Sequence, residues 1–227
     1  MTEPLPADCA ICQKPAELCV CAETEKIDNR IEVLILQHPQ EQDKTLGTAR
    51  LLAHQLSRAQ LKVGLSWPSL AKALGRDAEP RRWAVLYLGS AKAAPGREVE
   101  VQDAKGAVIA DQDRGMAGIE GVVVLDGTWS QAKALWWRNP WVLKCKRIVL
   151  APTHPSAYGR LRREPRREGL STIEAVGLLL GRLERRPEID AALFAGFRRM
   201  LERFRQSSHC RPAGQTEKKK DRRRHSA

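Results

Sequence analysis

Residues 121–137 read GVVVLDGTWSQAKALWW, in which a short aliphatic run passes into a helical pattern within a few residues. Residues 121–125 are rich in valine, as buried strands are, and a helix is predicted over residues 130–138. Asp126 lies at the carboxyl end of that strand, the edge at which open α/β sheets bind their ligands. This stretch therefore predicts a buried strand, a helix and a candidate site between them.

Thr128 and Gln131 have the spacing of a helix capping box. In that motif the threonine hydroxyl and the glutamine side chain satisfy backbone N–H groups of the first helical turn. The cap therefore accounts for Thr128 without any ligand. It does not require Asp126, whose carboxylate is left available for chemistry.

Other segments of the chain continue the same alternation. Strands are predicted from Ile31 (IEVLIL), over residues 83–88 (WAVLYL) and over residues 147–150 (RIVL), and helices over residues 41–56, 171–184 and 188–204. Residues 95–118 allow either a hairpin or an irregular excursion. Because strands and helices alternate, we predict an α/β fold whose parallel sheet has flanking helices.

Composition limits the class of protein. The chain has 227 residues, 42% of them hydrophobic, which suits one principal core. No apolar run approaches the roughly 20 residues that span a bilayer, and the N-terminal segment lacks the pattern of a signal peptide. We therefore expect a soluble, cytoplasmic protein without a membrane partner. The net charge of +12 favours an anionic partner, and residues 207–227 are expected to form a disordered basic tail.

Four of the six cysteines lie within thirteen positions, as Cys9, Cys12, Cys19 and Cys21. Four thiolates at this spacing can close a tetrahedral site around one zinc ion, and such a site is structural because no coordination position stays open. Reduced free thiols and an iron–sulfur cluster are the alternatives. We predict a zinc-binding module over residues 1–28 and a main α/β domain, which holds the candidate site, over residues 29–206.

The run Asp126-Gly127-Thr128-Trp129, together with the upstream cysteine pattern, resembles the DTW-domain family. The likeness covers most of the chain and includes residues 37–41 (QHPQE), 44–52 (KTLGTARLL), 158–163 (YGRLRR) and 171–175 (STIEA). It implies a fold similar to that of SPOUT-type enzymes, with a C-terminal trefoil knot that holds S-adenosylmethionine.

The activity implied by the resemblance is that of a tRNA-uridine aminocarboxypropyltransferase. Such an enzyme moves the 3-amino-3-carboxypropyl group of S-adenosylmethionine to N3 of a uridine and releases methylthioadenosine. The proton on N3 must leave, so we expect Asp126 to accept or orient it. A contact between Asp126 and the cofactor amine, or a structural role in the turn, stays open.

The resemblance also implies two sets of binding residues. Cofactor-binding residues are expected to be Leu125, Asp126, Thr128, Trp129, Pro152, Arg160, Ser171, Thr172 and Glu174. Substrate RNA is expected to meet His38, Lys44, Arg50, Arg162, Arg163, Arg166 and Arg167. Simpler interpretations exist for some of these residues: Ser171 and Glu174 have capping-box spacing, and the arginines alone would fit a solvated basic loop.

Other functions also fit the sequence. A SPOUT-type RNA methyltransferase would use the same cofactor, and a non-catalytic, zinc-containing RNA-binding module would leave Asp126 unexplained. The tryptophans at residues 129, 136, 137 and 141 could stack on bases, but indoles at helical spacing are more often core, and only Trp129 is predicted to line the pocket. We expect no obligate protein partner, and a monomer rather than a homodimer.

Overall fold

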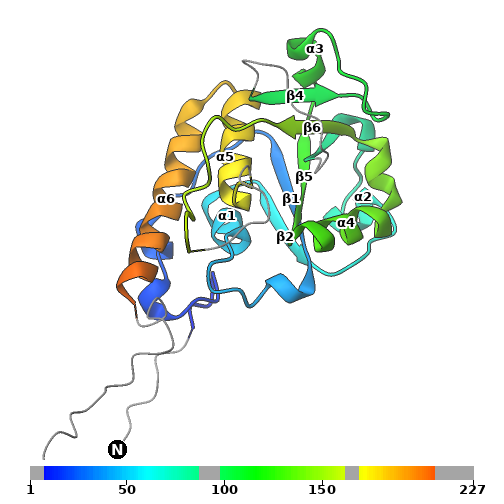
Figure 1. Ribbon diagram of the computed structural model, residues 1–227. Coiled ribbons are helices and arrows are strands. Elements are labelled where there is room, and N and C mark those ends of the chain that lie inside the picture. Colours follow the sequence, from blue (N-terminus) through cyan, green and yellow to red (C-terminus); the bar gives the residue numbers. More distant parts are fainter. Residues whose placement is uncertain (1–7, 87–97, 162–168, 208–227) are drawn as a thin grey trace, which may run out of the picture.

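The structure is a computed structural model, and it describes residues 8–86, 98–161 and 169–207 (Figure 1). In the described part of the chain, a six-stranded sheet has the order β2-β1-β5-β3-β6-β4. Its strands are β1 (Glu32–Gln37), β2 (Ala59–Val63), β3 (Trp83–Leu86), β4 (Val99–Gln102), β5 (Gly121–Asp126) and β6 (Lys146–Leu150). All neighbouring strands are parallel except β4, which runs antiparallel to β6 at one edge. The predicted α/β sheet is confirmed, with this antiparallel edge strand as a correction.

Helices flank the sheet on both faces (Figure 1). They are α1 (Ala49–Gln55), α2 (Leu70–Leu74), α3 (Gln112–Met116), α4 (Trp129–Arg138), α5 (Thr172–Leu183) and α6 (Pro187–Gln206). Short 3-10 helices span Ala16–Leu18, Cys21–Glu23, Pro39–Glu41, Pro80–Arg82 and Pro140–Lys144. The predicted helices over residues 130–138, 171–184 and 188–204 are confirmed to within a few residues.

The helix predicted over residues 41–56 is shorter than expected, because α1 begins only at Ala49. The carbonyl groups of Thr45 and Leu46 accept hydrogen bonds from distant side chains, those of Lys14 and Tyr158, at 2.6 Å each. Tertiary partners thus replace the helical ones, and residues 44–48 form turns instead.

The core has two parts, one on each face of the sheet. Alternate residues of a strand point to opposite faces, so Val33 and Ile35 of β1 pack with α1, α5 and α6, whereas Leu34 and Leu36 pack with α2 and α4. Strand β5 divides in the same way. The sheet is therefore buried on both faces, which explains why β1 and β5 are continuous aliphatic runs in the sequence.

The cysteine-containing segment packs against this core. Leu18 and Val20 are buried, and Val20 belongs to the core on the α6 side. Near the end of α6, Arg203 donates a hydrogen bond to the carbonyl of Cys19 and forms an ion pair with Glu23. The first helical turns of the chain are thus attached to the last helix, although the boundary predicted at residue 28 stays a prediction.

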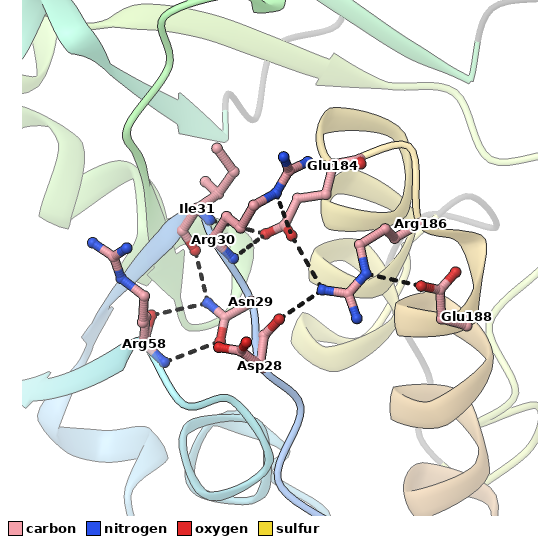
Figure 2. Close-up of polar contacts among 8 residues, drawn as sticks. All are labelled: Asp28, Asn29, Arg30, Ile31, Arg58, Glu184, Arg186 and Glu188. Atoms are coloured by element: carbon pink, nitrogen blue, oxygen red, sulfur yellow. Dashed lines mark hydrogen bonds and ion pairs between the residues drawn. The ribbon is translucent and has the colours of Figure 1, made fainter.

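Figure 2 shows the polar contacts that join the start of β1 to the end of α5. The Glu184 side chain is fully buried, and its Oε1 accepts the backbone N–H groups of Arg30 and Ile31 at 2.8 and 2.9 Å. The other carboxylate oxygen lies 3.5 Å from Arg30 and 3.7 Å from Arg186. One carboxylate therefore anchors the turn that precedes β1.

We expect Glu184→Ala to lower the free energy of unfolding by about 2 kcal/mol, because two backbone donors lose their acceptor. Glu184→Gln should cost less, since an amide oxygen can still accept both N–H groups. The matched control is Glu188→Ala, which removes only an exposed partner of Arg186 and should have little effect. Equal stability of Glu184→Ala and the wild type in urea denaturation would contradict this role.

Among the described residues, no helix combines the length and the apolar character needed to span a bilayer.

Candidate functional site

Asp126 lies at the end of β5, directly opposite Gln37 at the end of β1. By the alternation of the two strands, both side chains point to the face that carries α1, α5 and α6. Gln37 Nε2 donates a hydrogen bond to Asp126 Oδ2 at 2.8 Å, and the hydroxyl of Thr172 donates to Oδ1. Thr172 is the first residue of α5, so three segments distant in sequence converge on this one carboxylate.

The turn after Asp126 has a specific local structure. Gln131 Oε1 accepts the backbone N–H of Thr128 at 2.6 Å, which confirms the predicted capping box. A Cβ on Gly127 would lie 2.8 Å from the Cβ of Gln131, so only glycine fits beside this cap. The amide of Gln131 also donates to Gln40 Oε1 at 3.1 Å, which joins the turn after β5 to the turn after β1.

The start of α5 is fixed by a second capping box, as its sequence predicts. The buried carboxylate of Glu174 accepts the backbone N–H of Ser171 at 2.8 Å. It also accepts the hydroxyl of Ser156 at 2.6 Å and the backbone N–H of Ala157 at 2.8 Å. Glu174 therefore holds the segment that follows β6 against the first turn of α5, next to Thr172.

Residues 44–50 border the same place. Thr48 Oγ1 accepts the backbone N–H of Ile173 at 3.3 Å, and the Tyr158 hydroxyl donates to the carbonyl of Leu46. The Tyr158 ring is buried and meets Phe197 of α6 edge to face, with ring centroids 5.0 Å apart. The structure thus brings the segments at residues 37–41, 44–50, 126–131, 156–158 and 171–174 together at one edge of the sheet.

The predicted site residues differ in their surroundings. Thr128, Trp129, Lys44 and Arg160 are exposed, whereas His38, Arg50, Pro152 and Thr172 are half-buried. Leu125 is buried on the opposite face of the sheet, among the residues that pack with α2 and α4. The remaining arginines of the prediction, Arg162, Arg163, Arg166 and Arg167, lie outside the described residues.

Gln37 was not among the predicted site residues, although it contacts Asp126 directly. The signal that could have identified it is a polar residue at the end of a continuous aliphatic strand, which is the same signal that identified Asp126. Gln37 is buried, so its amide is held in place and not merely solvated.

The thiols of Cys9, Cys12, Cys19 and Cys21 form a compact cluster, with all four sulfur atoms within 4.8 Å of one another. Tetrahedral coordination with metal–sulfur bonds of ~2.3 Å places sulfur atoms ~3.8 Å apart, so this donor set fits a metal ion with small adjustments. Burial raises the pKa of the Cys12 thiol to about 11 and that of Cys21 further. A bound cation would be needed to keep these thiols ionised.

Lys14 links this cluster to the site. Its ammonium group is buried, which lowers its pKa to about 8, and it donates to the carbonyl of Thr45 at 2.6 Å. Thr45 belongs to the turns of residues 44–48, which contact the first turn of α5 through Thr48. The cysteine cluster therefore supports the segment that borders Asp126.

Known proteins resemble this chain in sequence over most of its length. The chain is 26% identical over 194 residues to tRNA-uridine aminocarboxypropyltransferase 2 of Macaca fascicularis, and 29% identical over 191 residues to the protein of that name from Drosophila melanogaster. Each alignment covers 82% of this chain, but only 59% of the macaque and 70% of the fly protein. The chain thus spans about three-fifths of the length of the macaque relative.

No solved structure matches this chain. The family model of the DTW domain matches residues 6–205, which is most of the chain. That range includes the cysteine cluster, the whole sheet and the convergence of segments around Asp126. The chain therefore belongs to the DTW domain family.

Proposed function

We propose that this chain is a tRNA-uridine aminocarboxypropyltransferase, which transfers the 3-amino-3-carboxypropyl group of S-adenosylmethionine to N3 of a tRNA uridine. The observation that carries the proposal is the carboxylate of Asp126, held by Gln37 and Thr172 at the carboxyl edge of a parallel sheet. The names of the two relatives support the same activity.

The sulfonium is a good leaving group, so the enzyme mainly has to position the uridine and remove its N3 proton. Bound S-adenosylmethionine would supply an electrophilic γ carbon, whose bond to the sulfonium sulfur breaks with release of methylthioadenosine. Asp126 would accept or orient the N3 proton of the uridine as the new N–C bond forms. Each oxygen of the carboxylate accepts one hydrogen bond from the protein, and a carboxylate has about four lone-pair sites, so capacity for the substrate remains.

The residues around Asp126 would divide between the two substrates. The first turn of α5, with Ser171, Thr172 and Glu174, would position the cofactor, largely through the backbone because the capping box uses both side chains of Ser171 and Glu174. Thr128, Trp129 and Pro152 complete the proposed pocket, and Arg160 would pair with the carboxylate of the transferred group. The side chain of Leu125 is buried on the opposite face of the sheet, so only its backbone could contribute.

The RNA would approach over the turns after β1. His38, Lys44 and Arg50 lie on the segment that borders Asp126, and the basic residues Arg162, Arg163, Arg166 and Arg167 are proposed to extend this surface. Contacts between such side chains and phosphates release counterions, so binding should weaken steeply as salt rises. A basic surface that binds a polyanion agrees with the net charge of +12.

The four cysteines are proposed to hold one structural zinc ion. Four thiolates fill a tetrahedral site and leave no position for a substrate, and Lys14 gives the cluster a supporting contact with the turns beside the site. The proposal also includes a SPOUT-type fold with a C-terminal trefoil knot and a separate zinc module over residues 1–28. A cytoplasmic location and a monomeric state complete it. The tail predicted from residue 207 lies almost wholly outside the described residues, which end at residue 207.

A double-label experiment tests the activity. The purified protein is incubated with unmodified tRNA and S-adenosylmethionine labelled either on the carboxyl carbon or on the methyl carbon. We expect only the carboxyl label to enter the RNA. Methyl label in the RNA would identify a methyltransferase, and binding of tRNA without either label would favour a non-catalytic RNA-binding protein.

A further inference from the structure

Helix α4 presents two tryptophans to solvent, beginning three residues after Asp126. Trp129 is 41% exposed and Trp137 is 68% exposed, and the exposed Lys133 lies between them. These residues are four positions apart, so they lie above one another along one face of the helix. We call this surface, made of Trp129, Lys133 and Trp137, the α4 face.

Trp137 is far more exposed than the other tryptophans nearby, which have contacts within the protein. Trp141 is buried and donates its indole N–H to the carbonyl of Trp67 at 3.0 Å. Trp136 is half-buried, and the guanidinium of Arg147 lies 5.6 Å from its ring centroid. A tryptophan is highly buried on average, and here two exposed indoles lie on one helix, which makes this helix surface a candidate for binding.

The charge around the α4 face indicates the kind of partner. Residues 127–150 contain five lysines and arginines and no aspartate or glutamate. Lys133, Arg138 and Lys144 of this stretch are exposed. An exposed indole on a helix whose own charged side chains are all cations fits a partner with both flat π faces and negative charge, which is the chemistry of unpaired nucleotides. A purely apolar protein partner would offer no negative charge to the ammonium group of Lys133 between the two indoles.

The position of the face agrees with this assignment. Trp129 and Trp137 are eight residues apart, which is ~12 Å along a helix with a rise of 1.5 Å per residue. The helix begins at Trp129, three residues after Asp126, so its first turn lies at the same edge of the sheet as the site, although α4 packs on the face opposite to the one to which the Asp126 side chain points. An RNA strand that reaches the site would therefore cross this edge of the sheet to reach α4.

We propose that the α4 face binds unpaired nucleotides next to the modified uridine, with one base stacked on Trp137 and a phosphate on Lys133. This inference rests on the proposed function and deepens it, because it identifies the structural class of RNA that the site takes. A loop or a single strand can place bases on indoles, whereas the bases of a duplex are already stacked on each other. Recognition by this face would therefore select looped or single-stranded uridines.

The test compares binding of a fluorescein-labelled single-stranded oligouridylate, a duplex RNA of the same length and bulk tRNA, all without S-adenosylmethionine. We expect Trp137→Ala to weaken binding of the single strand by roughly tenfold, the usual loss when one stacking aromatic is removed. Trp137→Phe should retain most of the affinity, and Trp137→Leu should resemble the alanine variant. Binding of the duplex should change little.

The matched control is Val108→Ala, which truncates another exposed apolar side chain, 52% exposed, on the segment that bridges to Gln102 of β4 at the far edge of the sheet. Its RNA affinity should equal that of the wild type. Unchanged binding by Trp137→Ala, or full affinity in Trp137→Leu, would overturn the proposal. Loss of self-association in Trp137→Ala without any loss of RNA affinity would overturn it too, and would assign the face to a second copy of the chain.

The transfer reaction provides an independent readout. Because Trp137 lies well beyond the first turn of α4, Trp137→Ala should raise KM for tRNA and leave kcat nearly unchanged. If the wild-type protein binds the single strand through Trp137 but transfers no label, the proposed activity is refuted, whereas the nucleotide-binding role of the α4 face is supported. Normal transfer with no dependence on Trp137 would refute the face alone.

Discussion

Asp126→Asn should reduce aminocarboxypropyl transfer by at least about 100-fold in a folded protein, because positioned acid–base groups contribute about 10²- to 10⁴-fold. The variant keeps the shape of the side chain but loses its charge. One of the two positions that now accept hydrogen bonds from Gln37 and Thr172 would become an amide donor. The uridine would then lose both the proton acceptor and its orientation. The measurement is single-turnover transfer from carboxyl-labelled S-adenosylmethionine.

The controls separate chemistry from folding. Asp77→Asn changes an exposed acid outside the site and should leave transfer unchanged. Thr172→Val should show an intermediate loss, because it removes one donor to Asp126, whereas Thr172→Ser should retain activity. Thermal unfolding of each variant checks that the fold persists. Normal turnover and normal cofactor affinity in a folded Asp126→Asn variant would remove Asp126 from the site.

Replacing Cys12 and Cys21 together with serine should abolish metal binding and destabilise the protein by several kcal/mol, because a structural metal site contributes its binding free energy to folding. Both thiols are buried, and the surrounding segment has little other apolar burial than Leu18 and Val20. We also expect transfer to fall, since Lys14 would no longer hold the carbonyl of Thr45. Metal analysis and thermal unfolding measure the two primary effects.

Cys145→Ala is the matched control for the cysteine cluster. Cys145 is buried and lies outside the cluster, so this variant should keep the full metal content. Because coordinated thiols must be deprotonated, chelators should also remove the metal more readily as the pH falls. A wild-type protein that contains no metal after purification without chelators would contradict the zinc proposal, as would unchanged metal content in the double variant.

Several elements could be predicted because their signal is local. Strands β1 and β5 are buried on both faces, and their sequences are accordingly continuous aliphatic runs. Strand β2 has the sequence AQLKV and was not predicted, because it lies at the edge of the sheet with mostly half-buried residues. Strand β4, with the sequence VEVQ, falls in the range left ambiguous, and its pairing with β6 is a long-range contact.

The candidate site also has features with a local sequence signal and features that depend on long-range contacts. Asp126 at a strand end, the two capping boxes and the four cysteines could be identified from the sequence, because each depends on residues within about a dozen positions of one another. The pairing of Asp126 with Gln37 and Thr172, and the exposure of Trp137 beside a buried Trp141, follow from the tertiary fold alone. Local patterns decide which residues enter a strand or a helix, whereas the order and register of strands distant in sequence decide which side chains meet.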